Sequence, residues 1–170
     1  MQLQSLNDLF VEQLEDLHSA EKQLVEALPK MASASSHEEL RDAFEKHLAD
    51  TREHVKRLDK ILSKLGETPS SKKCKGMEGL IKEGEEVLKM QGDPSVIDAA
   101  LIAAAQRVEH YEISGYGTAR TLAGHLDLGD ARDILDETLD EESKADELLT
   151  KIATGGMFKT GVNQEAKAGA

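Results

Sequence analysis

The sequence predicts an all-α fold, and three observations support this prediction. Leu, Ala, Glu, Lys and Asp dominate the 170 residues, while runs of β-branched residues are absent. Hydrophobic residues make up 39% and charged residues 32% of the chain, which is typical of folded helices with solvated outer faces. Apolar residues recur with the period of an α-helix over four long segments. The length is sufficient for one domain with a sizeable core.

The first two long segments are predicted to form a helical pair. The first helix is expected over about residues 6–31, with Ser5 as its N-cap. A short serine-rich turn follows, in which Ser36-x-x-Glu39 predicts a capping box that starts the second helix. That helix continues to about Gly66. Because only a few residues join the two helices, they are expected to pack as an antiparallel hairpin.

The second helical pair follows the same plan. Asp93 is a favourable N-cap and Pro94 suits the first helical position, so a third long helix is expected from here to about His125. The short connection LDLGD leads into a fourth helix at about residues 131–153. Residues 154–170 are rich in glycine and polar side chains, and they are predicted to form a flexible, poorly ordered C-terminal tail.

About 28 residues separate the two hairpins and contain a short amphipathic helical segment at about residues 77–90. A connection of this length can cross the whole length of a bundle. Two antiparallel hairpins joined by one long crossover is the ferritin-like connectivity. We therefore expect residues 1–153 to form a ferritin-like four-helix bundle domain. The alternative is any other four-helix bundle with an insertion, and the connection lengths alone do not separate the two.

Charged residues and a histidine interrupt or flank the apolar faces of all four long helices at mid-length. The set is Glu21 in the first helix, Asp50 and His54 in the second, Glu109 and Glu112 in the third, and Glu142 and Asp146 in the fourth. A buried carboxylate without a partner is costly by several kcal/mol, so it must be paired, protonated or bound to metal. Because four helices carry such residues at similar depth, we predict one shared site.

An internal repetition supports the shared site. Two spacings recur about 90 residues apart, His18-x-x-Glu21 with Glu109-x-x-Glu112 and Asp50-x-x-x-His54 with Glu142-x-x-x-Asp146. Residues three or four apart on a helix project to the same face, and two neighbouring cations need hard oxygen donors and often imidazole. The sequence therefore favours a dinuclear metal site. The alternative is that acids fall at these spacings by chance among the 33 acidic residues and pair with arginines.

Four stretches of the sequence resemble one known family. They are DLHSAEKQLVEALPKM, FEKHLADTREHVKRLDKIL, VEHYEISGYGTA and LDETLDEESKADELLTKIA. Together they resemble the YciE/YciF-type ferritin-like stress protein family over about residues 5–153, and the VEHYEI-x-x-YGT run is the most specific part. The resemblance implies a ferritin-like four-helix bundle, a homodimer, a dinuclear iron site related to that of rubrerythrin, and a bacterial stress-linked role. The family supplies no established reaction.

The resemblance also implies which residues bind the metal. The ligands it implies are Glu21, Asp50, His54, Glu109, Glu112, Glu142 and Asp146. The sequence departs from the general ferritin-like pattern, because the second and fourth helices lack Glu-x-x-His and Asp50 is one methylene shorter than Glu. The donor set is therefore oxygen-rich, which leaves manganese open beside iron. Glu53, His47 and His18 are further residues that could join the site.

Two functions are consistent with these features. The first is a dinuclear metal protein that handles iron or peroxide, as a ferroxidase or peroxidase-type oxidoreductase would. The second is a non-enzymatic, dimeric helical stress protein with a structural or vestigial metal site. An iron-storage cage ranks last, because a dimer of this kind encloses no volume.

Charge and cysteine content restrict the partners and the compartment. The net charge of −12 argues against nucleic acid and anionic membrane partners. The sequence shows no transmembrane run and no secretory signal. The single Cys74 fits a reducing compartment, so a cytoplasmic location is expected. Its lysine neighbours predict a lowered pKa for an exposed thiol without a functional role.

Overall fold

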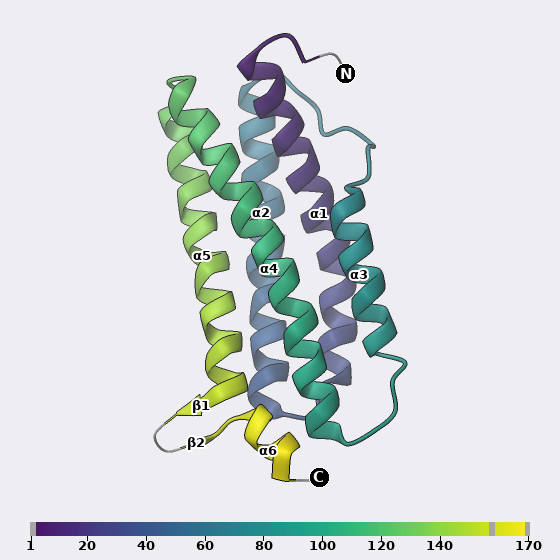
Figure 1. Cartoon of the computed structure of the whole chain (residues 1–170). Coiled ribbons are helices and arrows are strands. Elements are labelled where there is room, and N and C mark those ends of the chain that lie inside the picture. The colour runs from purple at the N-terminus through teal and green to yellow at the C-terminus, as the bar shows by residue number, and fades with distance from the viewer. Residues whose placement is uncertain (1–2, 157–158, 169–170) are drawn as a thin grey trace.

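The computed structural model describes residues 3–156 and 159–168 of the chain. Four long helices run side by side as a bundle, as Figure 1 shows. They are α1 (Leu6–Ala34), α2 (Glu38–Lys64), α4 (Pro94–His125) and α5 (Gly129–Thr154). Helices α1 and α2 form one antiparallel hairpin, and α4 and α5 form the other. The predicted all-α fold of two hairpins is confirmed.

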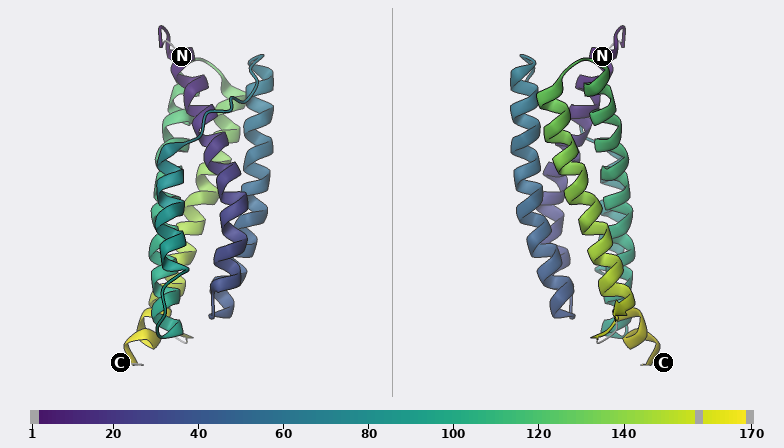
Figure 2. Two further views of the ribbon diagram at one scale, coloured as in Figure 1. Left: turned by 90° about the vertical axis from the view of Figure 1, so that its right-hand side faces the viewer. Right: turned by 90° about the vertical axis from the view of Figure 1, so that its left-hand side faces the viewer.

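The crossover between the hairpins contains the short helix α3 (Lys75–Val87). This helix packs along the outside of the bundle against α4 and α1. The left-hand view in Figure 2 shows α3 and α2 on opposite sides of α1. The crossover therefore runs the length of the bundle, as its number of residues predicts. Within the described residues, no helix combines the length and the apolar character that crossing a membrane requires.

The helix starts are partly those that the sequence predicts. Ser5 caps α1 in a complete capping box, and Asp93 caps α4 by accepting a hydrogen bond from the backbone N–H of Ser95. The predicted capping box of the second helix is wrong, because the N-cap is His37 and makes no side-chain capping bond. Asp98 of α4 binds this turn instead, and the start of α2 is thereby fixed to the other hairpin.

The core consists of two apolar clusters, one toward each end of the bundle. The cluster at the end of the bundle where α1 begins includes Phe10, Leu14, Leu58, Leu62, Leu122 and Leu135. The cluster toward the other end includes Leu24, Leu28, Leu40, Phe44, Leu101 and Ile152. The apolar residues of these two clusters recur with the helical period and pack inward as predicted, whereas Leu6 at the start of α1 is 42% exposed. Between the two clusters lies a layer of polar side chains.

The described part of the C-terminal segment, residues 155–156 and 159–168, is folded in the structure, whereas the sequence predicts a poorly ordered tail over residues 154–170. Residues 157–158 and 169–170 of that predicted tail lie outside the described residues. Strands β1 (Gly155–Gly156) and β2 (Lys159–Thr160) form an antiparallel pair, and α6 (Val162–Ala168) packs against α4 and α5. Val162 has no exposed surface. Gly155 adopts a φ of 71°, and a Cβ on Gly161 would lie 2.2 Å from the backbone nitrogen of Gly155. The two glycines therefore permit a close approach of their backbones that other residues would not.

Cys74 is buried, so the prediction of an exposed thiol is wrong. Its side chain caps α3 and lies 3.1 Å from Asp16 Oδ2 and 3.0 Å from the hydroxyl oxygen of Tyr111. Burial raises the pKa of the Cys74 thiol, the opposite of the predicted direction. Lys72 and Lys73 do not lower this pKa, because their side chains form ion pairs with Glu12 and Glu78.

Candidate metal centre

The structure brings together five of the seven predicted ligands in the polar middle layer of the bundle. These are Glu21 of α1, His54 of α2, Glu109 and Glu112 of α4, and Glu142 of α5. Four of them have no exposed surface, and Glu109 is 2% exposed. His47 of α2 joins them and is also buried. We call these six residues the central cluster, and all four long helices contribute to it.

One group within the central cluster could hold a cation between α1, α2 and α5. It consists of Glu21, His54 and Glu142, each of which offers an atom within 4.8 Å of the others. His54 Nδ1 lies 3.3 Å from Glu21 Oε1 and 2.9 Å from Glu142 Oε1. An imidazole nitrogen and two carboxylates therefore converge on one point.

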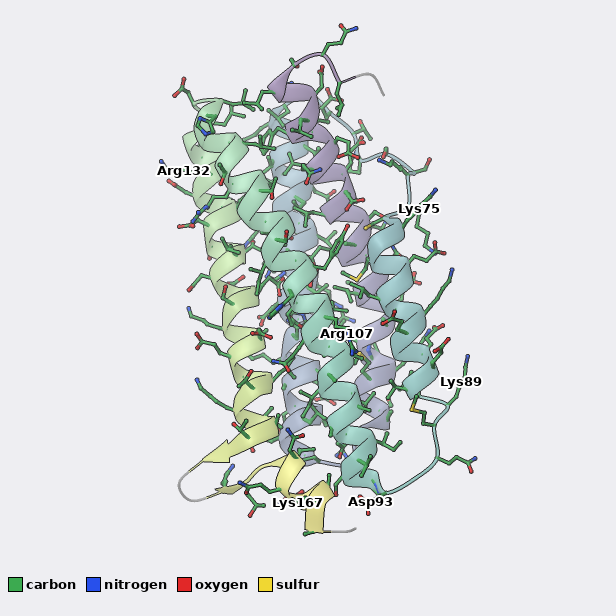
Figure 3. The ribbon with its side chains drawn as sticks, viewed as in Figure 1. Lys75, Lys89, Asp93, Arg107, Arg132 and Lys167 are labelled. Carbon is green, nitrogen blue, oxygen red and sulfur yellow. The ribbon has the colours of Figure 1, made fainter. Side chains whose placement is uncertain are left out.

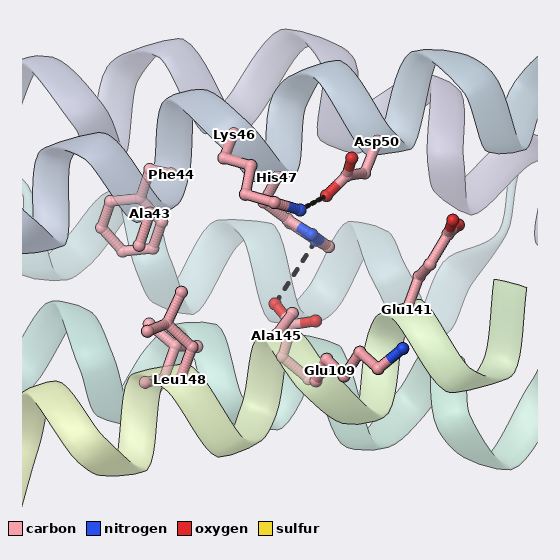
Figure 4. Close-up of a pocket in the computed structure, with 11 residues that line it drawn as sticks. Ala43, Phe44, Lys46, His47, Asp50, Glu109, Glu141, Ala145 and Leu148 are labelled. Atoms are coloured by element: carbon pink, nitrogen blue, oxygen red, sulfur yellow. Dashed lines mark hydrogen bonds and ion pairs between the residues drawn. The ribbon is translucent and has the colours of Figure 1, made fainter.

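A second group lies beside the first, between α2, α4 and α5. It consists of His47, Glu109, Glu112 and Glu142, whose ligating atoms also lie within 4.8 Å of one another. His47 Nε2 is 3.4 Å from Glu109 Oε1, the contact drawn in Figure 4, and 3.8 Å from Glu142 Oε2. Glu142 belongs to both groups. Two neighbouring cation positions would therefore share one carboxylate.

Many polar atoms of the central cluster are buried without a hydrogen bond. They are Glu21 Oε2, His47 Nε2, His54 Nδ1, Glu109 Oε2, both carboxylate oxygens of Glu112 and both of Glu142. The contacts of His54 Nδ1 are thus short ion-pair contacts rather than aligned hydrogen bonds. A buried polar group left unsatisfied costs about 1–3 kcal/mol. Bound cations would satisfy these atoms, so the residues present fit a metal site.

Burial and charge shift the pKa values of these groups in different directions. Burial raises the pKa of Glu109 and Glu112 well above the ordinary value, and the charge of Glu142 raises it further. Burial also raises the pKa of Glu21, to about 7. Burial on its own would raise the pKa of Glu142 and lower that of His54. The contact between these two side chains acts against burial: it lowers the pKa of Glu142 and contributes to raising the pKa of His54 to about 11. Without metal, both shifts favour the charged forms of Glu142 and His54.

A second layer of side chains orients the ligands. His54 Nε2 lies 2.9 Å from Glu141 Oε2, and Arg57 binds the same carboxylate. This arrangement directs Nδ1 of His54 toward the cluster. On the other side, the Tyr116 hydroxyl donates a hydrogen bond to Glu21 Oε1. Tyr116 therefore both fills the core and holds a candidate ligand.

The structure does not bring Asp50 or Asp146 into either group. Asp50 forms an ion pair with Lys46, and Asp146 accepts a hydrogen bond of 3.0 Å from Gln106. The geometry of α2 explains the first case. Seven residues make nearly two full helical turns, so His47 and His54 share the inward face, whereas Asp50 between them is turned aside.

His47 is the residue that the sequence did not place among the ligands, although it was named as a further candidate. Its spacing of seven from His54 is the signal that could have identified it. The two other further candidates lie elsewhere. His18 Nε2 is 3.0 Å from Asp59 Oδ1, and Glu53 pairs with Lys56 at 2.8 Å.

Arginines do not neutralise the central cluster. Arg107 lies exposed on α4 and is labelled in Figure 3, and Arg120 pairs with Asp136 at 2.7 Å. Arg57 binds Glu141, in the second layer. Among the described residues, no lysine or arginine forms an ion pair with any of the six cluster residues. The alternative of an ordinary ion network therefore does not account for these acids.

Comparison with known proteins places the chain among relatives of the same length. Residues 5–167 match the family described as "Domain of unknown function (DUF892)". Protein YciF of Escherichia coli strain K12 is 44% identical over 165 residues, which cover 96% of this chain and 99% of that protein.

Solved structures show the same fold. The crystal structure of the E. coli stress protein YciF has a TM-score of 0.85 at 45% identity, covering 88% of this chain and 94% of that chain. YcfI from Rhodopseudomonas palustris has a TM-score of 0.85 at 39% identity, covering 89% and 96%. Ferritin-like, diiron-carboxylate proteins from Bacillus anthracis have a TM-score of 0.68 at 18% identity, covering 88% and 98%, and they show that the fold is ferritin-like. The chain belongs to the DUF892 family and is a homologue of YciF.

Proposed function

We propose that the protein is a dinuclear metal-binding protein with a stress-linked role, with iron as its metal and manganese as the alternative. The unsatisfied buried atoms of the central cluster are the observation that carries the proposal. Carboxylate oxygens with one imidazole in each group suit divalent iron or manganese. The stress-linked role rests on the relation to YciF, whose crystal structure is described as that of a stress protein.

Each cation position would have its own ligands and one shared ligand. Glu21 and His54 would hold the first cation, and His47, Glu109 and Glu112 would hold the second, with Glu142 shared between them. The four glutamates would balance the charge of two divalent cations. Bound iron would supply redox chemistry toward dioxygen or peroxide, in a ferroxidase or peroxidase-type reaction.

The chain's own residues would orient the ligands and exclude water from the first position. Tyr116 would fix Glu21 through its hydroxyl, and Glu141 would keep Nε2 of His54 engaged so that Nδ1 faces the cation. The apolar clusters on both sides keep water from most of the layer. A dry, preorganised site strengthens the interaction of carboxylates with cations.

Metal titration tests this proposal directly. Purified protein would be analysed for metal content and then titrated with ferrous iron without oxygen, and two ions per chain are expected, one for each group. Glu142→Ala should abolish binding at both positions, and Glu112→Ala should weaken the second. Glu147→Ala on the exposed side of α5 is the matched control. Failure to bind iron or manganese, with an unchanged melting temperature, would contradict the proposal.

The alternative is a non-enzymatic protein whose metal is structural, and the deep burial of the first group favours it. The alternative predicts the same metal content but no consumption of oxygen or peroxide by the iron-loaded protein. The proposal also includes a homodimer, which rests on the resemblance to the YciF-type family. Analytical ultracentrifugation of the metal-loaded protein would test this state.

A further inference from the structure

A cavity of about 180 Å³ lies between α2 and α5 and opens at the surface (Figure 4). Its inner end is formed by His47 and Glu109, which belong to the second cation position. Glu21 and His54 of the first position do not line it. Among the described residues, this cavity therefore borders ligands of the second cation position and not those that belong to the first position alone.

The wall of this cavity is largely apolar. It is lined by Ala43, Phe44, Ala145, Leu148 and Leu149. Leu148 stands at the surface and is 37% exposed. Apolar side chains around an open space beside a charged cluster are unfavourable in water, and an apolar group placed between them would be stabilised.

The two residues at the inner end of the cavity have buried polar atoms that lack a hydrogen bond. His47 Nε2 and Glu109 Oε2 are buried without a hydrogen bond, and these side chains are 8% and 3% exposed. In the metal-loaded protein, the second cation would therefore lie at the end of an apolar cavity. A hard divalent cation prefers an oxygen donor as an additional ligand.

Two lysines stand at the polar side of the cavity. Lys46 pairs with Asp50, and Lys144 pairs with Asp140. Glu141 also lines the cavity, but Arg57 neutralises it. The acids near the opening are thus balanced by basic side chains, so an anionic ligand meets no net repulsion there.

We propose that this cavity binds a short-chain monocarboxylate, with its carboxylate on the second cation and its hydrocarbon chain against Phe44, Leu148 and Leu149. The inference rests on the proposed metal site. The size fits, because an apolar cavity of about 150 Å³ holds a benzene-sized group of about six carbons. An amine of the same length lacks the oxygen donor and would be repelled by the cation.

A ligand series tests the inference. Protein loaded anaerobically with ferrous iron would be titrated by calorimetry with acetate, butyrate, hexanoate and butylamine, after its iron content is measured. Affinity should rise by up to about fourfold for each buried methylene, and butylamine should not bind. Ala145→Leu, which fills the cavity, should weaken hexanoate binding about tenfold and leave the iron content unchanged. Ala103→Leu on an exposed position of α4 is the control and should bind hexanoate like the parent protein.

The outcomes separate this inference from the proposed function. If the iron content is normal but all carboxylates bind with equal affinity, the carboxylate site is overturned and the proposed function stands. The same holds if the iron content is normal and Ala145→Leu has no effect on binding. Either result would leave the cavity as a passage for water and small oxidants. Equal hexanoate binding by metal-free protein also overturns it, because the cation would then have no part. Absence of iron binding overturns both the proposed function and the inference.

Discussion

Two buried acids on α4, Asp98 and Glu112, differ in their surroundings although neither reaches solvent. Asp98 accepts hydrogen bonds from the backbone nitrogens of Ser36 at 3.0 Å and His37 at 2.9 Å, and from the Ser36 hydroxyl. Glu112 has no hydrogen bond at either carboxylate oxygen. Burial alone therefore does not distinguish a structural carboxylate from a candidate ligand. The partners of the oxygens make that distinction.

The largest expected difference between these two regions is in metal content. Glu142→Ala removes the residue shared by both cation positions, so iron bound per chain should fall from two to none. Asp98→Ala removes a buried acid outside the central cluster, so the folded variant should still bind two. Elemental analysis after anaerobic loading and desalting measures both. Equal loss of metal in the two variants would show that the comparison is wrong.

The second expected difference is in stability. Asp98→Ala leaves three donors before the start of α2 without their acceptor. The free energy of unfolding should fall by at least about 4.5 kcal/mol, since each hydrogen bond to a charged group contributes about 1.5 kcal/mol or more. Urea denaturation monitored by circular dichroism measures this change. Asp42→Ala, at an exposed position of α2, is the control and should change stability little. A loss no larger than that of the control would contradict the structural role of Asp98.

The pH dependence of the metal-free protein gives a third test. Glu21 has its ordinary pKa when unfolded, but burial raises its pKa to about 7 in the folded protein. The folded state then binds more protons, so stability is greatest below the ordinary pKa and falls as the pH rises through about 7, by about 3 kcal/mol in total. Glu21→Gln should flatten this dependence in denaturation curves recorded between about pH 5 and about pH 8. Parallel curves for both proteins would refute it.

Glu112→Gln should have a smaller effect, opposite in sign to that of Asp98→Ala. Burial raises the pKa of Glu112 well above its ordinary value. Near neutral pH, folding must therefore either bury a charged carboxylate or protonate it, and a neutral amide at this position avoids that free-energy cost. The metal-free variant should be more stable by about 1–2 kcal/mol, while added iron should raise its melting temperature less than that of the parent. Differential scanning calorimetry with and without metal measures both changes. Glu147→Gln should alter neither, and a destabilised metal-free Glu112→Gln protein would contradict the assignment.

The contrast between Asp98 and Glu112 also shows which features could be predicted from the sequence: those that depend on nearby residues of the chain. The helical period and the caps at Ser5 and Asp93 predict helix positions well, because they depend on residues within one or two turns. The role of Asp98 could not be predicted, since its partners Ser36 and His37 lie in the other hairpin. Val162 likewise packs against distant helices, so the fold of the C-terminal segment was missed.

The candidate site was partly predictable for the same reason. Acids within the apolar faces indicate which helices contribute, so Glu21, Glu112 and Glu142 were expected at the centre. Which neighbour on each helix turns inward follows from its spacing to the other inward residues, and on α2 these residues lie seven apart. This accounts for His47 lying in the cluster while Asp50 lies beside Lys46.

The smallest expected effect concerns Tyr116, which connects the core to the central cluster. Its hydroxyl donates a hydrogen bond to Glu21, and removal of such a supporting group weakens metal binding by about tenfold or more. Tyr116→Phe keeps the ring between the helices but removes the donor to Glu21 Oε1, so the free energy of unfolding of the metal-free protein should fall by only about 1 kcal/mol. A competition titration against a chelator should show weaker binding at the first cation position only, because Tyr116 contacts no residue of the second group by a hydrogen bond among those described. Weakening of both positions alike would instead indicate that Tyr116 acts through the packing of the whole bundle.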